Sequence, residues 1–141
     1  MTAKEYLSGI RKKRLHCRTL ATKLEELEEM AKGVKAIRYD RDNVQTTPEN
    51  SMEKYLAEYM DVRIELSKAL VEYGEQMAKA EWQIEAMPNP IHAEVLRLRY
   101  IDDDNGRRMT FERISCIMHR SFDWVRHLHV QALKEFERRY L

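Results

Sequence analysis

Apolar residues recur at alternating spacings of three and four along the first part of the chain. This spacing places them on one side of an α-helix and predicts a long amphipathic helix over residues 3–34. Its apolar positions are Ala3, Tyr6, Ile10, Cys17, Leu20, Leu24, Leu27, Ala31 and Val34, with Lys13 as the only off-pattern member of the register. Gly33, Pro48 and polar residues between them predict a break, and a second helix is expected to restart at Ser51. Its apolar positions are Met52, Tyr55, Tyr59, Val62, Leu66, Ala69, Tyr73, Met77, Ala80, Ile84 and Met87.

The two predicted helices are expected to fold back on each other as an antiparallel, coiled-coil-like hairpin. Further apolar residues lie outside the narrow apolar line, namely Met30, Leu56, Met60, Ile64, Leu70 and Trp82. We therefore expect self-association as a homodimer or higher oligomer; the alternative is a monomer whose C-terminal domain covers this surface. The residues expected at the oligomer interface are Ile10, Cys17, Leu20, Leu24, Leu27, Tyr59, Leu66 and Tyr73.

Pro88 and Pro90 end the second helical pattern, because each proline disfavours helical geometry in the residue before it. They divide the chain into an oligomerisation hairpin, residues 1–87, and a C-terminal domain, residues 88–141. In the second part, a helix is predicted within residues 91–101, and two more helices meet at His119-Arg120-Ser121. A turn of about three residues is typical of a helix-turn-helix, whose second helix enters the major groove of DNA. The predicted fold class is all-α.

Both helices of this predicted helix-turn-helix carry an apolar line that would form their shared core. The first has Phe111, Ile114 and Met118, and the second has Val125, Leu128, Ala132, Leu133 and Phe136. Ser121 is expected to cap the second helix, because its hydroxyl can accept a hydrogen bond from a backbone N–H of the first turn.

The same segment carries a family resemblance. Glu94-Val-Leu-Arg-Leu-Arg-Tyr100, Thr110-Phe-Glu-Arg-Ile114, Ser121, Val125-Arg126 and Ala132-Leu133 resemble region four of bacterial sigma factors. The whole chain is similar to small phage and prophage proteins of Gram-positive bacteria that are related to the ArpU-type late-gene regulators. Its opening, Met1-Thr-Ala-Lys-Glu-Tyr-Leu7, and the loop Val44-Gln-Thr-Thr-Pro48 add to this resemblance.

The resemblance implies a helical hairpin followed by a helix-turn-helix of sigma region-four type. It implies a sequence-specific transcriptional regulator that binds double-stranded DNA in the cytoplasm of a bacterial host, with host RNA polymerase as a further candidate partner. Three features depart from the family: Phe122-Asp123-Trp124 stands where polar residues are usual, His119 stands where glycine is frequent, and an acidic insertion occupies residues 102–106.

With the second helix in a major groove, its exposed first turns would face base edges and its N-terminus would face phosphates. The expected base contacts are Phe122, Asp123, Trp124, Arg126 and His127. The expected phosphate contacts are Arg107, Arg108, Thr110, Arg120 and Ser121. Of the two aromatic residues, Phe122 is expected to pack against the neighbouring helix and Trp124 to be the more exposed.

The charge is unevenly distributed along the chain. The formal net charge is +1, made of +3 over residues 1–34, −4 over residues 35–87 and +2 over residues 88–141. Proteins that bind nucleic acid without sequence preference are usually far more basic, because phosphate neutralisation supplies their affinity. Most of these charges are therefore expected only to solvate helix faces, and the C-terminal segment is a partial exception, because basic residues crowd its last helix.

Other chemistry finds little support. Asp103, Asn105, Gly106 and Glu112 match four positions of a calcium-binding loop, but Ile101 occupies the first, where an acidic ligand is needed. His127 and His129 are two residues apart and so point to different sides of a helix, which favours contact with solvent or phosphate over a shared metal. Neither a catalytic arrangement nor a cofactor or metal site is expected, and Cys17 and Cys116 are expected to be reduced packing residues. The chain has no apolar run of membrane-spanning length, which predicts a cytoplasmic protein.

The main hypothesis is thus a sequence-specific phage or prophage transcriptional regulator, not an enzyme. A small terminase-like DNA-packaging subunit is the second, because it would also join a helix-turn-helix to a helical oligomerisation element. A helical protein-interaction module that has lost DNA binding is the third, supported by Phe122-Asp123-Trp124. Stoichiometry in solution separates the first two, and DNA affinity separates both from the third.

Overall fold

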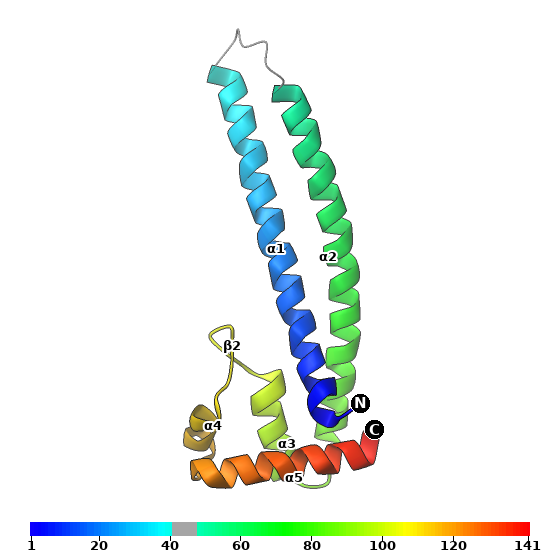
Figure 1. Ribbon diagram of the computed structural model, residues 1–141, viewed down its shortest axis with the longest axis vertical. Coiled ribbons are helices and arrows are strands. Elements are labelled where there is room, and N and C mark those ends of the chain that lie inside the picture. Colours follow the sequence, from blue (N-terminus) through cyan, green and yellow to red (C-terminus); the bar gives the residue numbers. More distant parts are fainter. Residues whose placement is uncertain (41–47) are drawn as a thin grey trace. The chain divides into compact units, whose positions relative to one another are not determined.

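The chain is mostly helical. The computed structural model describes the backbone of residues 1–40 and 48–141, and side chains outside residues 34–51. The elements are α1 (Ala3–Asp40), α2 (Pro48–Glu85), α3 (Pro90–Leu96), the π-helical turn η1 (Arg97–Ile101), β1 (Asp103–Asp104), β2 (Arg107–Arg108), α4 (Phe111–Met118) and α5 (Phe122–Tyr140) (Figure 1). The predicted all-α class is confirmed, with one short antiparallel pair of strands as an addition.

The first helix is longer than predicted. α1 passes through Gly33 and ends at Asp40, so the break expected at residue 33 does not occur there. A glycine inside a helix costs only about 0.5–1 kcal/mol relative to alanine, which the rest of a long helix can offset. α2 begins at Pro48, ahead of the predicted Ser51, and proline suits a first helical position. Of the loop Val44–Pro48, residues 44–47 lie outside the described residues, as do the side chains of Val34 and Ser51.

The chain forms two compact units, one of Arg14–Glu72 and one of Met1–Lys13 with Tyr73–Leu141. This division differs from the boundary at residue 88 that Pro88 and Pro90 indicate. The two prolines do separate α2 from α3, where Asn89 accepts a hydrogen bond from the backbone N–H of Ile91 at 3.0 Å. The start of α1 and the end of α2, however, share a core with the C-terminal elements.

The unit Arg14–Glu72 consists of two antiparallel helices. Polar pairs join α1 and α2 in opposite order along the chain, His16 with Glu65 at 3.9 Å and Lys23 with Glu58 at 3.8 Å. Between the helices lies a small apolar core of buried and half-buried side chains, namely Leu20, Leu24, Leu27, Tyr55, Tyr59, Val62, Leu66 and Ala69. The predicted antiparallel packing is therefore present in this part of the chain.

The second unit has the larger core. Its buried side chains come from α1, α2, α3, η1, α4 and α5, together with Met109: Ala3, Leu7, Ile10, Ala80, Ile84, Met87, Val95, Leu96, Tyr100, Ile101, Met109, Ile114, Val125, Leu128, Ala132 and Phe136. Within it α5 packs against both α3 and α4. The apolar lines predicted for α4 and α5 are confirmed, since Ile114, Val125 and Phe136 are fully buried and Phe111, Met118 and Leu133 pack around them.

Polar contacts fasten the start of the chain to this core. The Tyr6 hydroxyl donates to Oε1 of Gln83 at 3.0 Å, and the Tyr140 hydroxyl donates to the backbone oxygen of the same glutamine at 2.6 Å. The backbone N–H of Ala3 donates to a carboxylate oxygen of Glu137 at 3.0 Å. The first turn of α1, the end of α2 and the end of α5 are thus held together.

Candidate nucleic-acid interface

The turn between α4 and α5 is closed by a cap on each side. His119 ends α4 in the left-handed conformation, with φ 54° and ψ 43°. The N–H of Arg120 then donates to the Ser115 carbonyl at 3.0 Å, which satisfies a carbonyl at the end of the helix. Ser121 begins α5, because its hydroxyl accepts from the N–H of Trp124 at 3.2 Å. The predicted cap is confirmed, and the two caps fix the direction in which α5 leaves the turn.

The left-handed conformation of His119 carries a cost that can be measured. For an L-residue the left-handed conformation is unfavourable by about 1–2 kcal/mol, because Cβ approaches the following carbonyl. Glycine, which has no Cβ, has no comparable penalty. We expect His119→Gly to raise the free energy of unfolding by about 1 kcal/mol, after the larger chain entropy of glycine in the unfolded state is subtracted. Denaturant unfolding measures the change. His119→Ala, which keeps Cβ, is the matched control and should give no gain; an equal gain in both variants would contradict the explanation.

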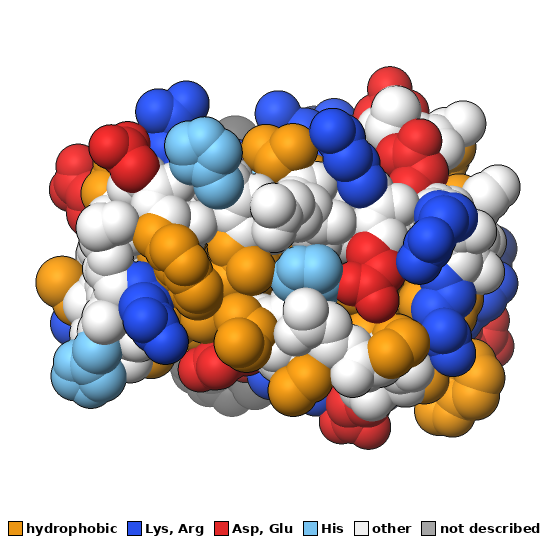
Figure 2. Space-filling view, turned by 90° about the horizontal axis from the view of Figure 1, so that it is seen from below, with side chains coloured by type: hydrophobic (Ala, Val, Ile, Leu, Met, Phe, Trp, Pro, Cys, Tyr) orange, Lys and Arg blue, Asp and Glu red, His pale blue; other side chains and the backbone are white. Residues whose placement is uncertain are grey.

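The outward side of α5 presents a mixed surface. Opposite its buried side lie exposed side chains of several kinds: Asp123, Arg126, His127, Val130, Gln131 and Lys134. Figure 2, seen from below over α5, shows blue, pale blue, red and orange side chains interleaved over this unit, without one continuous field of positive charge. A surface of this kind would recognise a partner through individual side chains more than through its overall charge.

Two of the predicted base-contact residues are exposed and have donors to offer. The Arg126 guanidinium lies 5.7 Å from the ring centre of Phe122, so its position on the surface is partly fixed. Nδ1 of His127 lies 2.7 Å from the Asp123 carbonyl oxygen, and it must donate because a carbonyl only accepts. The opposite ring nitrogen of His127, Nε2, is therefore the atom that can meet a partner.

The two aromatic residues are placed in the reverse of the predicted way. Trp124 is half-buried and packs against the core of the unit, whereas Phe122 is 40% exposed. The Arg120 guanidinium lies 4.9 Å from the Trp124 ring centre and covers its outer side. Helical spacing gives the direction of a side chain but not how far the neighbouring elements reach, and this is why the prediction was wrong. Phe122, and not Trp124, is the aromatic side chain available to a partner.

His129 corrects a second prediction. It is expected to contact solvent or phosphate, yet it is buried, and its Nε2 lies 2.8 Å from the Tyr100 hydroxyl. Phe111 meets its ring edge-on, with the ring centres 4.9 Å apart. Burial, together with the positive charges of Arg99 and Lys4, lowers the pKa of His129 to about 4. The imidazole is therefore neutral at physiological pH and belongs to the core that supports α5.

The acidic insertion forms a β-hairpin instead of an irregular loop. Asp103 pairs with Arg108 and Asp104 with Arg107, and the turn residues Asn105 and Gly106 have φ 52° and 82°. Asn-Gly is the preferred pair for a two-residue hairpin turn, because both positions need positive φ. The sequence thus contains a hairpin signal in a segment for which only an acidic insertion and a calcium-binding loop are weighed above.

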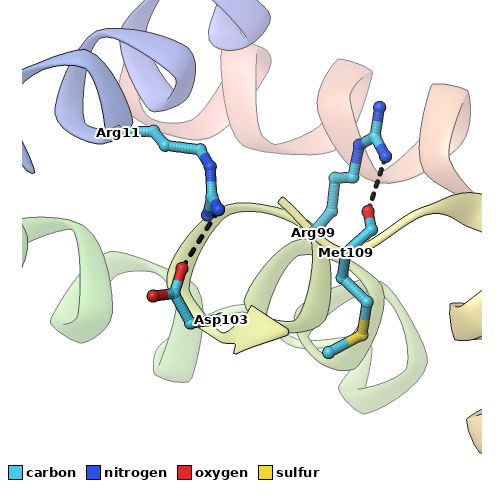
Figure 3. A network of polar contacts seen from close by, with 4 residues as sticks. All are labelled: Arg11, Arg99, Asp103 and Met109. Carbon is cyan, nitrogen blue, oxygen red and sulfur yellow. Dashed lines mark hydrogen bonds and ion pairs between the residues drawn. The ribbon is translucent and has the colours of Figure 1, made fainter. Parts of the chain in front are cut away.

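Side chains from other elements hold the hairpin in place (Figure 3). The Arg11 guanidinium lies 3.0 Å from a carboxylate oxygen of Asp103 at the base of β1. Arg99, from η1, donates to the carbonyl of Met109 at 2.6 Å just after β2, and its guanidinium lies 4.0 Å from the Phe111 ring centre. Burial, and then the charges of Arg108 and Arg11, lower the pKa of Arg99. Arg11 and Arg99 are thus structural cations, and their part was missed in the sequence analysis.

The predicted phosphate contacts come from three places in this unit. Arg107 and Arg108 are exposed on β2, and Arg120 and Ser121 are exposed at the start of α5. Thr110 begins α4, where its hydroxyl oxygen accepts from the N–H of Arg113 at 3.1 Å. The hydroxyl hydrogens of Thr110 and Ser121 are not used in these caps, so both side chains can still donate to an anion.

The predicted oligomer-interface residues face the interior of their own chain. Ile10, Cys17, Leu20 and Leu27 are buried, while Leu24, Tyr59, Leu66 and Tyr73 are half-buried beside the two cores. The apolar residues predicted to lie outside the narrow line do so: Met30, Leu56, Met60, Ile64, Leu70 and Trp82 are all exposed. The apolar surface left open to a partner is therefore on the outer sides of the helices.

Within residues 1–33 and 52–141 no three His, Cys, Asp or Glu side chains gather closely enough to hold a metal ion. No helix in the described part of the chain is both long enough and apolar enough to cross a bilayer. Cys17 and Cys116 are free thiols; Cys17 is buried as expected, but Cys116 is exposed and so is not a packing residue.

Comparison with protein family models, curated proteins and solved structures gave no match.

Proposed function

We propose that α4, the turn and α5 form a helix-turn-helix that binds double-stranded DNA with sequence preference, as part of a phage or prophage transcriptional regulator. α5 would lie in the major groove, with Arg126 and His127 towards base edges and Phe122 against thymine methyls. Arg120, Ser121 and Thr110 would hold phosphates from the helix N-termini, and Arg107 and Arg108 would do so from the β-hairpin. The regulatory part of the proposal rests on the resemblance carried by residues 91–136.

The observation that carries this proposal is the capped turn His119–Ser121. It joins an eight-residue helix to a helix whose inner side is buried and whose outer side is exposed, with Arg126 and His127 near its start. A short turn of this kind is what allows a second helix to project from a small domain into a groove. The buried support under α5, from Val125 to Phe136, gives the rigid base that recognition of individual bases requires.

Removing Arg126 should weaken binding selectively. We expect Arg126→Ala to cost about 1–3 kcal/mol on the preferred DNA sequence, which is a loss of affinity of roughly 5- to 150-fold, and to relax the preference at one position. Selection from random duplexes would give the preferred sequence. Fluorescence anisotropy on that duplex and on a scrambled one would give both affinities.

Arg108→Ala and Arg18→Ala are the comparison variants. Arg108→Ala removes an expected phosphate contact, so it should weaken all sequences alike and lower the salt slope by about one unit. Arg18→Ala removes the same charge from an exposed position on α1 and should leave both affinities unchanged. No enriched sequence, combined with equal affinities for Arg126→Ala and the unchanged protein, would exclude DNA reading by α5.

A protein-interaction module is the second candidate function. Phe122 and Val130 are 40% and 50% exposed and lie with Arg126 on one side of α5. Exposed aromatic and aliphatic side chains around an arginine are also typical of protein interfaces. This function predicts that Phe122→Ala removes binding of a protein partner while duplex DNA has no measurable affinity for the chain.

A further inference from the structure

A line of uncharged residues runs along the outer side of α2 in the unit Arg14–Glu72. It consists of Ala57, Met60, Ile64, Ser67 and Val71, all of them exposed, and we call it the outer stripe. Met60 is 50%, Ile64 52% and Val71 62% exposed. On the opposite side of the same helix, Val62 and Leu66 pack against α1. α2 therefore has a second apolar side that the described residues of this unit leave exposed.

The spacing of the outer stripe is that of a coiled-coil seam. Its residues follow one another at intervals of three, four, three and four, so they occupy the two core positions of a heptad repeat. Asp61 and Lys68 then flank the seam on one side, and Leu56, Arg63 and Leu70 flank it on the other. Because α2 is already folded and supported by α1, docking a second helix against it does not require the further loss of conformational entropy that folding α2 would cost.

We propose that the outer stripe pairs with the outer stripe of a second copy of this chain, with the two α2 helices antiparallel. In this pairing Met60 lies against Val71 of the second copy, and Ile64 lies against Ser67 of the second copy. The two-fold axis repeats each layer, so the stripe is complementary to itself. The small side chains of Ala57 and Ser67 allow close approach of the two helices beside the larger Met60 and Ile64.

The flanking charges favour the antiparallel direction. In an antiparallel pair, the flank that carries Asp61 and Lys68 faces the same flank of the second helix. Asp61 then lies opposite Lys68 of the second copy. In a parallel pair, the flank that carries Arg63 instead faces the flank of the second helix that carries Lys68. Arg63 then lies opposite Lys68 of the second copy, which places two positive charges together. Opposite charges at such positions set the direction of a helix pair more than its strength.

A charged residue in the stripe should separate the two copies. We expect the unchanged full chain to sediment as a dimer at micromolar concentration, and Ile64→Lys to raise the dimer dissociation constant at least about tenfold, because two layers lose their apolar contact. Analytical ultracentrifugation measures both. Helix content by circular dichroism should stay the same, since Ile64 is exposed. Leu15→Lys, a similar change at an exposed position of α1, is the matched control and should leave the dimer intact.

Charge reversal tests the direction of pairing. Lys68→Asp should weaken the antiparallel dimer, and Asp61→Lys combined with Lys68→Asp should restore it. A parallel pair would instead be strengthened by Lys68→Asp alone, which would overturn the proposed arrangement. A monomeric unchanged protein, or a dimer insensitive to Ile64→Lys, would overturn the proposal as a whole. None of these measurements uses DNA, so they are independent of the function proposed for α5.

Discussion

Replacing Phe136 with alanine is expected to lower the free energy of unfolding of the unit Met1–Lys13 with Tyr73–Leu141 by about 3–5 kcal/mol. Phe136 is fully buried on α5, and its ring lies 5.9 Å from that of Tyr6 and 4.9 Å from that of Tyr140. Small domains have a total stability of only about 5–15 kcal/mol, so this single change would remove a large share of it. Denaturant unfolding followed by tyrosine and tryptophan fluorescence would measure the loss.

Phe122→Ala makes the same chemical change on the same helix. Phe122 is 40% exposed, so its loss should cost less than about 1 kcal/mol. The start of α1 gives a second readout. The backbone N–H of Ala3 donates a hydrogen bond to Glu137, the residue that follows Phe136. Hydrogen exchange of the first turn of α1 should become faster in Phe136→Ala and remain unchanged in Phe122→Ala. Similar costs for the two substitutions would contradict the burial that separates them.

Helical spacing predicted α4 and α5 because these two helices are short, amphipathic and capped. Ser121 is the predicted cap of α5 and caps it in the structure, while Thr110, expected only as a phosphate contact, also caps a helix. Ile114, Val125 and Ala132 lie on apolar lines, and all three are fully buried. In this part of the chain, local preference and packing point to the same structure, which is why the prediction succeeded.

The same reasoning could not separate the two compact units. The apolar lines of α1 and α2 change only slightly where the units divide: Lys13 takes one position of the first line, and Ala69, Tyr73 and Met77 follow at two successive steps of four in the second. Periodicity shows which side of a helix is buried, but it does not identify what buries it. Ile10 and Leu20 therefore look equivalent in the sequence, while one packs in the larger core and the other against α2.

Polar residues in the core were missed for a related reason. His129 lies on α5 next to Leu128 and is taken as part of a basic surface, because histidine is usually found in contact with water. Its burial depends on Tyr100, which is far from it in the sequence and supplies a hydroxyl at 2.8 Å. Arg11 and Asp103, which lie outside the core, also form a pair, at 3.0 Å, between segments distant in the sequence. Contacts of this kind follow from tertiary structure and leave no local pattern.

The burial of His129 should make the unit lose stability in mild acid. The pKa of His129 falls from 6.5 to about 4 on folding, so the unfolded chain binds a proton in a pH range where the folded protein does not. The folded unit keeps its full stability above about pH 6.5. It loses stability as the pH falls towards 4, because protonation of His129 then favours the unfolded chain. The loss amounts to at most about 3.5 kcal/mol, since each unit of pKa difference corresponds to about 1.4 kcal/mol.

Two substitutions separate the causes of this acid sensitivity. His129→Phe removes the titrating group, so its stability should fall less steeply than that of the unchanged protein between pH 6.5 and 4. Tyr100→Phe removes the hydrogen bond at a cost of about 1 kcal/mol but keeps the buried imidazole, and burial is the main cause of the lowered pKa. It should therefore retain the steep fall. Titration of the His129 ring protons by NMR gives the folded pKa directly, and a value near 6.5 would show that this side chain is open to water and α5 less firmly supported than the structure requires.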